Sequence, residues 1–146
     1  MRNNYYGSEI SGKITSINPE FHTIKTPDDL YSALKKIWCE YSCAPRMRSN
    51  WSENNITLGQ CSITAFLAQD IFGGKVFGIP NDDGSFHCYN RVGDYNFDLT
   101  SEQFGGEILD YNCQHEQFRE KHFANSEKKL RYKYLRSELE KFCRNM

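Results

Sequence analysis

The first clear hydrophobic pattern follows a helix start at residues 26–29, Thr-Pro-Asp-Asp. Threonine caps a helix, proline suits its first turn, and two acidic residues face the positive end of the helix dipole. Apolar side chains then recur at helical spacing, at Leu30, Leu34, Ile37, Trp38 and Tyr41. The pattern predicts a helix that begins near residue 27 and ends before Pro45.

A second helix is predicted to run from residues 59–61, Gly-Gln-Cys, to about Phe72. It ends at Gly73 and Gly74, because glycine accepts the left-handed conformation that closes many helices. Its apolar side chains are Ile63, Phe66, Leu67 and Ile71. The preceding residues 45–60 are polar and irregular, with apolar anchors at Trp51, Ile56 and Leu58.

Three strands are predicted after the second helix, at residues 75–80, 85–92 and 95–99. The turns between them are residues 81–84, Asn-Asp-Asp-Gly, and residues 93–94, Gly-Asp. Thr100 and Gln103 resemble a capping box for a short helix. A last helix, from Ser126 to about Phe142, has its predicted buried side at Leu130, Tyr134, Leu135, Leu139 and Phe142.

These elements predict an α+β fold, with helices packed on one face of a small antiparallel sheet. The length of 146 residues suits a single domain spanning residues 1–146. Residues 1–25 are polar and weakly patterned, and we expect either a loose N-terminal arm or an edge strand. Residues 105–125 have no clear pattern.

Charge and hydropathy exclude several classes of protein. The 18 basic and 19 acidic residues leave a net charge of −1, which is no electrostatic footprint for nucleic acid. No apolar run is long enough to span a membrane, and no apolar stretch follows Arg2 as in a secretory signal. We therefore expect a cytoplasmic protein that binds neither nucleic acid nor membrane.

Six cysteines allow three interpretations: disulfides, a metal site, or free thiols. Without a secretory signal we expect free thiols in a reducing compartment. Cys39 and Cys43 would share one face of the predicted first helix, and Cys113 and His115 could join them around a metal ion. Because the chain has no Cys-x-x-Cys pair, we expect no structural zinc and no cofactor.

Cys61 is predicted to lie where a loop meets the N-terminus of the second helix. Free backbone N–H groups and the positive end of the dipole favour the thiolate at such a position. The same N–H groups can bind the oxyanion of a tetrahedral intermediate, and the Gln60 side chain is a candidate additional donor. The position therefore suits a nucleophile.

The predicted hairpin supplies a base and a carboxylate. If residues 93–94 form a two-residue turn, Val92 faces Tyr95, and His87 faces Thr100. One face of the hairpin then carries His87, Tyr89, Arg91, Asn96, Asp98 and Thr100. Asp98 becomes the diagonal neighbour of His87, where a carboxylate can hold the imidazole in one tautomer and stabilise its charged form.

Together, Cys61, His87 and Asp98 occur in the order helix, strand, next strand, as in papain-like and transglutaminase-like enzymes. We therefore predict a cysteine hydrolase or acyltransferase that acts on the peptide, amide or ester carbonyl of a small molecule or peptide. Candidate oxyanion or substrate-binding residues are Gln60, Trp51, Tyr89 and Asn90. The alternatives are a non-catalytic binding or regulatory protein on the same scaffold, and a metal or redox protein that uses the thiols.

The stretch from Trp51 to Phe104 resembles the YunG-like family of uncharacterised small bacterial proteins. The matching pieces are residues 59–65, Gln69-Asp70, Gly73-Gly74, His87, Asn90-Arg91, Asp98-Leu99-Thr100 and Gln103-Phe104, together with residues 131–135 near the C-terminus. The resemblance implies a compact protein of papain-like (NlpC/transglutaminase-like) appearance, and it brings no established activity. Family members tend to have a longer aromatic run after the histidine, where this chain has Cys88-Tyr89.

Overall fold

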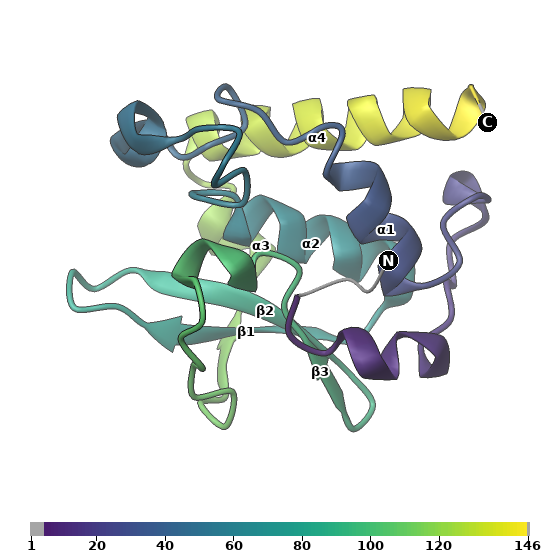
Figure 1. Ribbon diagram of the computed structural model, residues 1–146, viewed down its shortest axis with the longest axis horizontal. Helices are drawn as coiled ribbons and strands as arrows, with labels where there is room; N and C mark the ends of the chain where they lie inside the picture. Colours follow the sequence, from purple (N-terminus) through teal and green to yellow (C-terminus); the bar gives the residue numbers. More distant parts are fainter. Residues whose placement is uncertain (1–4, 146) are drawn as a thin grey trace.

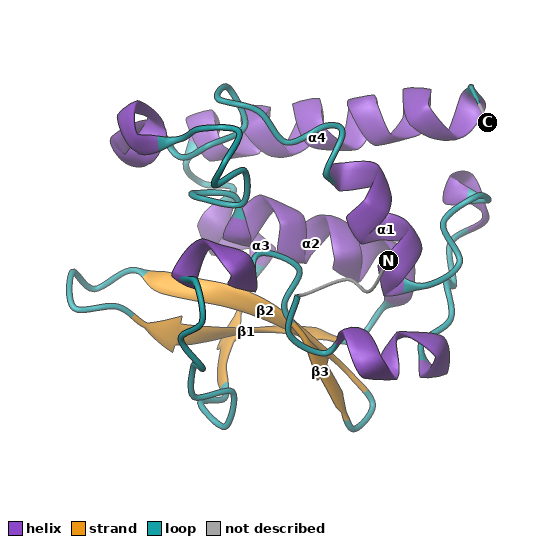
Figure 2. Cartoon of the chain, viewed as in Figure 1, coloured by secondary structure: helices purple, strands orange, loops and turns teal. Residues whose placement is uncertain are grey.

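The computed structural model describes residues 5–145, in which the helices lie above one face of an antiparallel sheet (Figure 1). The long C-terminal helix is the outermost layer, a central helix lies beneath it, and the sheet is at the bottom (Figure 2). The helices are α1 (Pro27–Leu34), α2 (Cys61–Phe72), α3 (Arg119–His122) and α4 (Ser126–Arg144), with short 3-10 helices η1 (Ser8–Lys13), η2 (Pro19–Phe21), η3 (Pro45–Asn50) and η4 (Ser101–Phe104).

The strands form one four-stranded sheet in the part of the chain that the structure describes. They are β1 (Lys75–Pro80), β2 (Phe86–Val92), β3 (Tyr95–Phe97) and β4 (His115–Gln117), in the order β3-β2-β1-β4. Every neighbouring pair is antiparallel. The predicted α+β class and the predicted hairpins β1–β2 and β2–β3 are therefore confirmed, whereas β4 lies in the segment where the sequence had no clear pattern.

Helix α2 is the centre of the hydrophobic core. Its residues from Ile63 to Ala68 are all buried, because the sheet covers one side and α4 the other. The predicted start and end of this helix are confirmed. Gly73 and Gly74 follow it with φ angles of 77° and 75°, and a Cβ at Gly74 would lie 2.2 Å from the Arg91 carbonyl oxygen.

Helix α1 begins as predicted but ends earlier. The Thr26 side chain and the Asp29 side chain form a complete capping box, whereas the helix stops at Leu34 instead of continuing to residue 41. The chain leaves the helix there so that the Trp38 indole can donate to the Thr64 hydroxyl at 3.0 Å. The prediction that Cys39 and Cys43 share a helix face is therefore wrong.

The N-terminal residues 5–25 are packed against the rest of the domain, so the loose-arm alternative is wrong for them. Tyr5, Ile14, Phe21 and Ile24 belong to the main hydrophobic core. The Tyr6 carbonyl accepts a hydrogen bond from the Asp98 backbone N–H at 2.9 Å, in a single β-bridge beside β3. The edge-strand alternative is closer, although residues 5–25 form only one bridge. Residues 1–4 lie outside the described residues.

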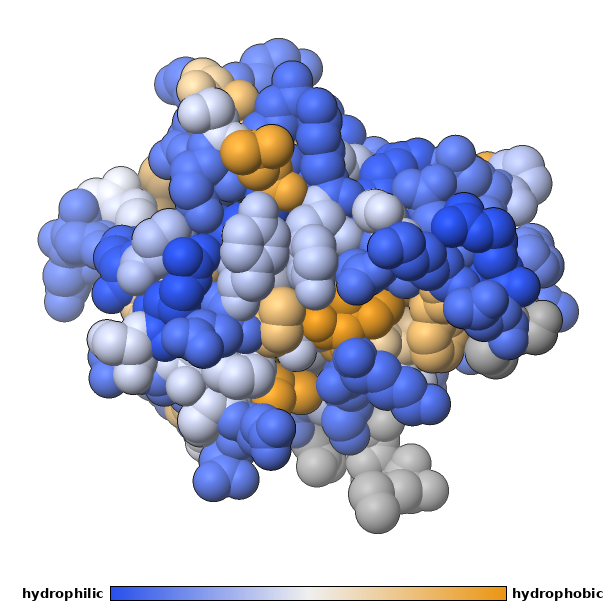
Figure 3. All heavy atoms as spheres, turned by 90° about the horizontal axis from the view of Figure 1, so that it is seen from above, coloured by the Kyte–Doolittle hydropathy of each residue, from blue (hydrophilic) through white to orange (hydrophobic). Residues whose placement is uncertain are grey.

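Helix α4 buries a stripe that shares only Leu135 and Leu139 with the predicted one. Its buried residues are Arg131, Tyr132, Leu135, Leu139 and Cys143, whereas Leu130 is 58% exposed. Four of these five recur at every fourth position, and the charged side chains between them make the surface seen from above mostly hydrophilic (Figure 3). None of the helices in the described residues is long and apolar enough to cross a membrane.

The predicted capping box at Thr100 does not form. Residues Ser101–Phe104 make the 3-10 helix η4, and the Thr100 side chain makes no capping hydrogen bond. Instead, the Thr100 hydroxyl and backbone N–H both donate to Asp98 Oδ1, at 3.3 and 3.2 Å. The Thr100 side chain therefore holds the Asp98 carboxylate instead of capping η4.

Candidate active site

The loop before α2 holds Cys61 at the first position of the helix. Gly59 has a φ of 72°, and a Cβ there would lie 2.5 Å from the Cys43 sulfur. The Gly59 carbonyl accepts a hydrogen bond from the Ala44 backbone N–H at 3.0 Å. Glycine is therefore required two residues before the cysteine, and the tight loop places Cys61 in the first turn of α2, where the backbone N–H groups have no partner within the helix.

The β2–β3 hairpin brings His87 and Asp98 together in the predicted register. Val92 pairs with Tyr95, and Asn90 pairs with Phe97. The His87 Nε2 atom lies 2.6 Å from Asp98 Oδ2, and the two side chains are only 3% and 1% exposed. The predicted contact between these two residues is therefore present.

The Asp98 carboxylate is held by further donors. Oδ2 also accepts the Tyr111 hydroxyl at 2.7 Å, while Oδ1 accepts both donors of Thr100. Tyr111 is in turn stacked on Tyr6, with ring centroids 3.8 Å apart. The carboxylate thus has little freedom to rotate away from His87.

The surroundings of His87 stabilise the positively charged form of its imidazole. Burial opposes its charged form, but the Asp98 carboxylate outweighs burial and raises the pKa of His87 to about 10. Phe104 of η4 meets the ring edge-to-face, with centroids 4.7 Å apart and an interplanar angle of 88°. Because Asp98 occupies Nε2, the ring nitrogen available to a substrate or to Cys61 is Nδ1.

The Cys61 thiol interacts with His87 and with a second buried cysteine, Cys88, and its sulfur lies 3.9 Å from the Phe86 carbonyl oxygen. A hydrogen bond from Cys88 lowers the pKa of Cys61, burial opposes it, and hydrogen bonding and charge from His87 lower it further, to well below its ordinary value. The same interaction with Cys61 raises the pKa of Cys88 well above its ordinary value. Cys61 is therefore the member of the pair that ionises, as its position at a helix N-terminus also favours.

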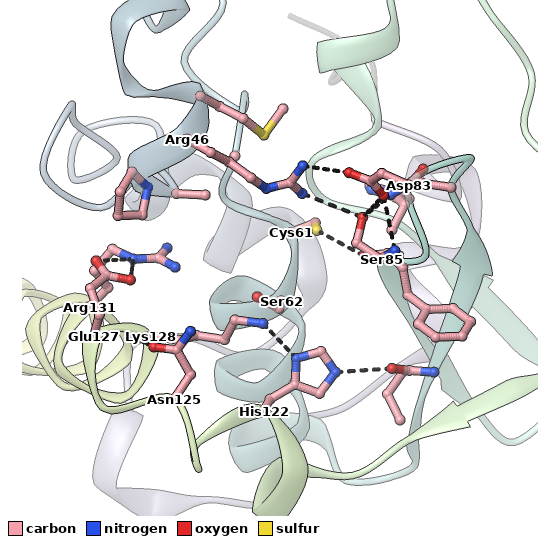
Figure 4. Close-up of a pocket in the computed structure, with 18 of the residues that line it drawn as sticks. Arg46, Cys61, Ser62, Asp83, Ser85, His122, Asn125, Glu127, Lys128 and Arg131 are labelled. Carbon is pink, nitrogen blue, oxygen red and sulfur yellow. Dashed lines mark hydrogen bonds and ion pairs between the residues drawn. The ribbon is translucent and has the colours of Figure 1, made fainter.

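A pocket of about 830 Å³ opens in front of Cys61. Phe86, His87 and Phe104 line one wall, and Lys128 and Arg131 of α4 line another. Figure 4 shows Cys61 and Ser62 at the start of α2, with side chains from α4 across the pocket. Cys61 is half-buried and lines this space.

Sequence reasoning missed a second histidine at the pocket. His122 Nδ1 lies 2.9 Å from the Lys128 ammonium, and His122 Nε2 lies 3.0 Å from Gln117 Oε1 (Figure 4). Burial and the neighbouring Lys128 lower the pKa of His122 to about 4. The sequence held one signal for this part of the pocket, namely Lys128. A cation in the first turn of a helix is disfavoured by the helix dipole, so its presence there suggests a role outside the helix.

The structure places the other predicted site residues outside the pocket. The Gln60 amide donates to the Cys39 carbonyl at 3.1 Å, and the Trp51 indole donates to the Ile56 carbonyl at 3.0 Å. Gln60 is fully buried and lies beside the pocket-lining Gly59 and Cys61 without lining the pocket itself. Its side-chain NH₂ is therefore not free to act as an oxyanion donor in this arrangement.

Tyr89 and Asn90 serve the packing of β2. The Tyr89 hydroxyl donates to the carbonyls of Tyr111 and Cys113, at 2.9 and 2.7 Å, on the side of the sheet away from α2. The Asn90 amide donates to the Ala65 carbonyl of α2 at 2.8 Å. Neither side chain lines the pocket.

The six cysteines are free thiols. Within residues 5–145, no group of three or more His, Cys, Asp or Glu side chains is arranged to hold a metal ion. The Cys39 sulfur instead lies 3.6 Å from the Tyr134 hydroxyl, and Cys43 is buried against Gly59. The thiols considered for a metal site therefore lie in separate surroundings.

Comparisons with known proteins identify one family. The family model described as YunG protein matches residues 26–144. The uncharacterized protein YunG of Bacillus subtilis (strain 168) is 40% identical over 75 residues, which are 51% of this chain and 60% of that protein, so the match spans less than two thirds of the relative. No solved structure matches the chain. On the extent of the family match, the chain belongs to the YunG protein family.

Proposed function

We propose that this protein is a thiol hydrolase or acyltransferase in which Cys61 is the nucleophile, His87 the acid and base, and Asp98 the residue that orients His87. The observation that carries the proposal is the buried 2.6 Å contact between His87 Nε2 and Asp98 Oδ2, beside a helix-terminal thiol at a pocket. An imidazole held by a carboxylate next to a thiol is the arrangement that activates cysteine nucleophiles.

The reaction would proceed in two halves. The Cys61 thiolate attacks the carbonyl carbon, a C–S bond forms, and the bond to the leaving group breaks as that group takes the proton from the His87 imidazolium. Water or an amine then attacks the thioester, His87 accepts its proton, and the C–S bond breaks to restore the thiolate. Asp98 keeps Nδ1 of His87 directed toward the reacting groups throughout.

The oxyanion of each tetrahedral intermediate would be held by backbone N–H groups at the first turn of α2. This assignment replaces the Gln60 side chain, whose NH₂ group donates to the Cys39 carbonyl. Backbone donors at a helix start are rigid and add the positive end of the dipole, so they suit a charge that exists only during the reaction.

A papain-like layout is part of the same proposal. The nucleophile begins the central helix, the histidine lies on the second strand of the sheet, and the carboxylate directly follows the third strand. That order in sequence and in space supports the layout, with peptide, amide and ester carbonyls as the substrate class.

An activated ester tests the proposal without a known substrate. On addition of p-nitrophenyl acetate we expect a rapid release of one nitrophenolate per chain, with the acetyl group found on Cys61 by peptide mapping. Slow turnover should follow, and an added amine should capture part of the acetyl group if transfer is possible. Cys61→Ser should abolish acylation, and His87→Gln should slow both halves of the reaction.

The alternative, a non-catalytic binding or regulatory protein, predicts a different outcome. Acylation that spreads over several cysteines, or a Cys61 acylation rate that does not depend on His87, would contradict the enzyme proposal and favour that alternative. The exposed histidine of β4 supplies the matched control, because His115→Gln removes an imidazole that lines no part of the pocket.

A further inference from the structure

The pocket in front of Cys61 has more positive than negative side chains. Arg46 is paired with Asp83, and Arg131 with Glu127, each at 2.8 Å. The other cationic residues that line the pocket, Lys121 and Lys128, form no ion pair with any carboxylate of residues 5–145. Lys121 is exposed at the rim, so Lys128 is the unpaired cation of the interior.

The ammonium group of Lys128 is held in a fixed direction. It donates to His122 Nδ1 at 2.9 Å, and this requires a neutral imidazole whose proton is on Nε2, where Gln117 Oε1 accepts it at 3.0 Å. Burial and the charge of Lys128 keep His122 neutral by lowering its pKa to about 4. The hydrogen bond from Lys128 to His122 uses one of the three ammonium protons and leaves two for a ligand.

Lys128 and the nucleophile share the pocket (Figure 4). Burial lowers the pKa of Lys128, and the sulfurs of Cys88 and Cys61 act in the opposite direction, so the ammonium lies within electrostatic reach of the thiol. Its position does not serve the helix, since a cation in the first turn of α4 opposes the dipole. Among the described residues, no carboxylate neutralises this half-buried charge.

We infer that Lys128 is a specificity-determining residue that binds a carboxylate carried by the acyl group of the substrate. The inference rests on the proposed function, because it gives the acyl donor a second anchor besides the carbonyl at Cys61. One ammonium with two remaining protons suits a singly charged carboxylate. Phe86 and Phe104 on the opposite wall suit the apolar stem between the two groups.

Two alkylating reagents of nearly the same size test this inference. Iodoacetate carries a carboxylate and iodoacetamide is neutral, and both attack the same Cys61 thiolate. A change in the thiolate fraction therefore cancels in the ratio of the two rates. We expect Lys128→Gln to reduce the iodoacetate-to-iodoacetamide ratio at Cys61 by at least about fivefold, because it removes the nearby charge.

The next residue on α4 provides the control. Lys129 is exposed and lines no part of the pocket, so Lys129→Gln removes the same charge from the same helix and should leave the ratio unchanged. Lys128→Arg should retain most of the preference for iodoacetate. An equal fall in the Lys128→Gln and Lys129→Gln variants, or no fall in either, would overturn the inference.

A measurement on the unaltered protein keeps the test decisive if the Lys128→Gln variant fails to fold. The iodoacetate-to-iodoacetamide ratio at Cys61 should exceed that of N-acetylcysteine by at least about fivefold, and a ratio no higher than that of the free thiol would overturn the inference. The proposed function fails on a separate observation, namely a Cys61 rate with neutral iodoacetamide that is the same with and without His87.

Discussion

The two ends of helix α2 each carry an ionic network, buried at the N-terminal end and partly buried at the C-terminal end, and the networks differ in which groups remain free. At the C-terminal end, Asp70 is paired with Arg119 and Arg136, each at 2.9 Å, and it also accepts the Tyr132 hydroxyl. At the N-terminal end, Cys61 meets His87, whose partner is Asp98. The first network joins α2 to α3 and α4, and both of its arginines are paired with a carboxylate of the protein.

The second network has three features that the first lacks: a nucleophile, a pocket, and polar groups that remain free to contact a ligand. Gln69 belongs to the first network as well, since its side-chain oxygen accepts a hydrogen bond from Arg119 at 2.8 Å. A network of partly buried charges alone therefore does not mark a site. Each variant below should affect Cys61 reactivity or stability, according to the network in which it lies.

The largest expected effect on reactivity comes from His87→Gln. Without the imidazolium, the thiol should return toward its ordinary pKa of about 8.5, so that about 1% is thiolate at a pH near 6.5. We expect iodoacetamide to label Cys61 about 100-fold more slowly at that pH. Labelling should be followed by peptide mapping, with His115→Gln as the control. A preference for Cys39, Cys88 or Cys143 in the unaltered protein would contradict the assignment of Cys61.

A smaller loss is expected from Asp98→Asn, which preserves shape. Thr100 requires an acceptor at the position of Oδ1, so the new NH₂ group would take the place of Oδ2 and face His87 Nε2. The amide cannot stabilise the imidazolium, and we expect Cys61 alkylation near pH 6.5 to fall at least about tenfold, or about 1.4 kcal/mol.

The hairpin offers a matched control for Asp98. Asp94 lies in the turn between β2 and β3 with its side chain 99% exposed, and Asp94→Asn should change neither rate nor melting temperature. An unaltered Cys61 rate in Asp98→Asn would remove Asp98 from the site and leave a dyad of Cys61 and His87.

Tyr111→Phe should have a slight effect on reactivity. It removes one of the hydrogen bonds to Asp98 Oδ2 and leaves the His87 contact in place. We expect a twofold to threefold lower alkylation rate, roughly, and a loss of about 1 kcal/mol in the free energy of unfolding. Denaturant titration measures the second quantity. A tenfold rate loss would show that Tyr111 does more than hold the carboxylate.

No effect on reactivity is expected from Asp70→Asn. The variant leaves Arg119 and Arg136 without their shared carboxylate, which is 13% exposed, so the free energy of unfolding should fall by about 2 kcal/mol. The Cys61 alkylation rate of the folded protein should stay within about twofold of the unaltered one. If the variant is stable but its Cys61 is alkylated more slowly than in the unaltered protein, the two ends of α2 are coupled.

Local signals predicted the parts of the fold that depend on neighbouring residues. The threonine cap at Thr26, the bounds of α2 and the register of the β2–β3 hairpin were predicted because caps, glycine stops and two-residue turns act over a few positions. The contact between His87 and Asp98 followed from that register alone. These predictions were the basis for choosing the candidate site.

Contacts between distant segments could not be predicted in the same way. The end of α1 depends on Trp38 reaching Thr64, and Tyr111 reaches Asp98 from a loop without a pattern. His122 and Lys128 join the pocket only because α3 and α4, which are distant in sequence from Cys61, pack against α2. Glutamine at position 60 had the right residue type beside Cys61, but the Cys39 carbonyl accepts its amide.

The central claim is that Cys61 and His87 form a thiolate–imidazolium pair, and the titration of the Cys61 thiolate tests it most directly. Ultraviolet absorbance of the thiolate, measured as the difference between the unaltered protein and Cys61→Ser, follows that ionisation with pH. Because the pKa of Cys61 is lowered well below its ordinary value and that of His87 is raised to about 10, the ion pair should exist between the two. We predict that the thiolate absorbance is already present below about pH 7, and that it changes again near pH 10, where His87 loses its proton. A single ionisation near the ordinary thiol pKa of about 8.5 would contradict the account.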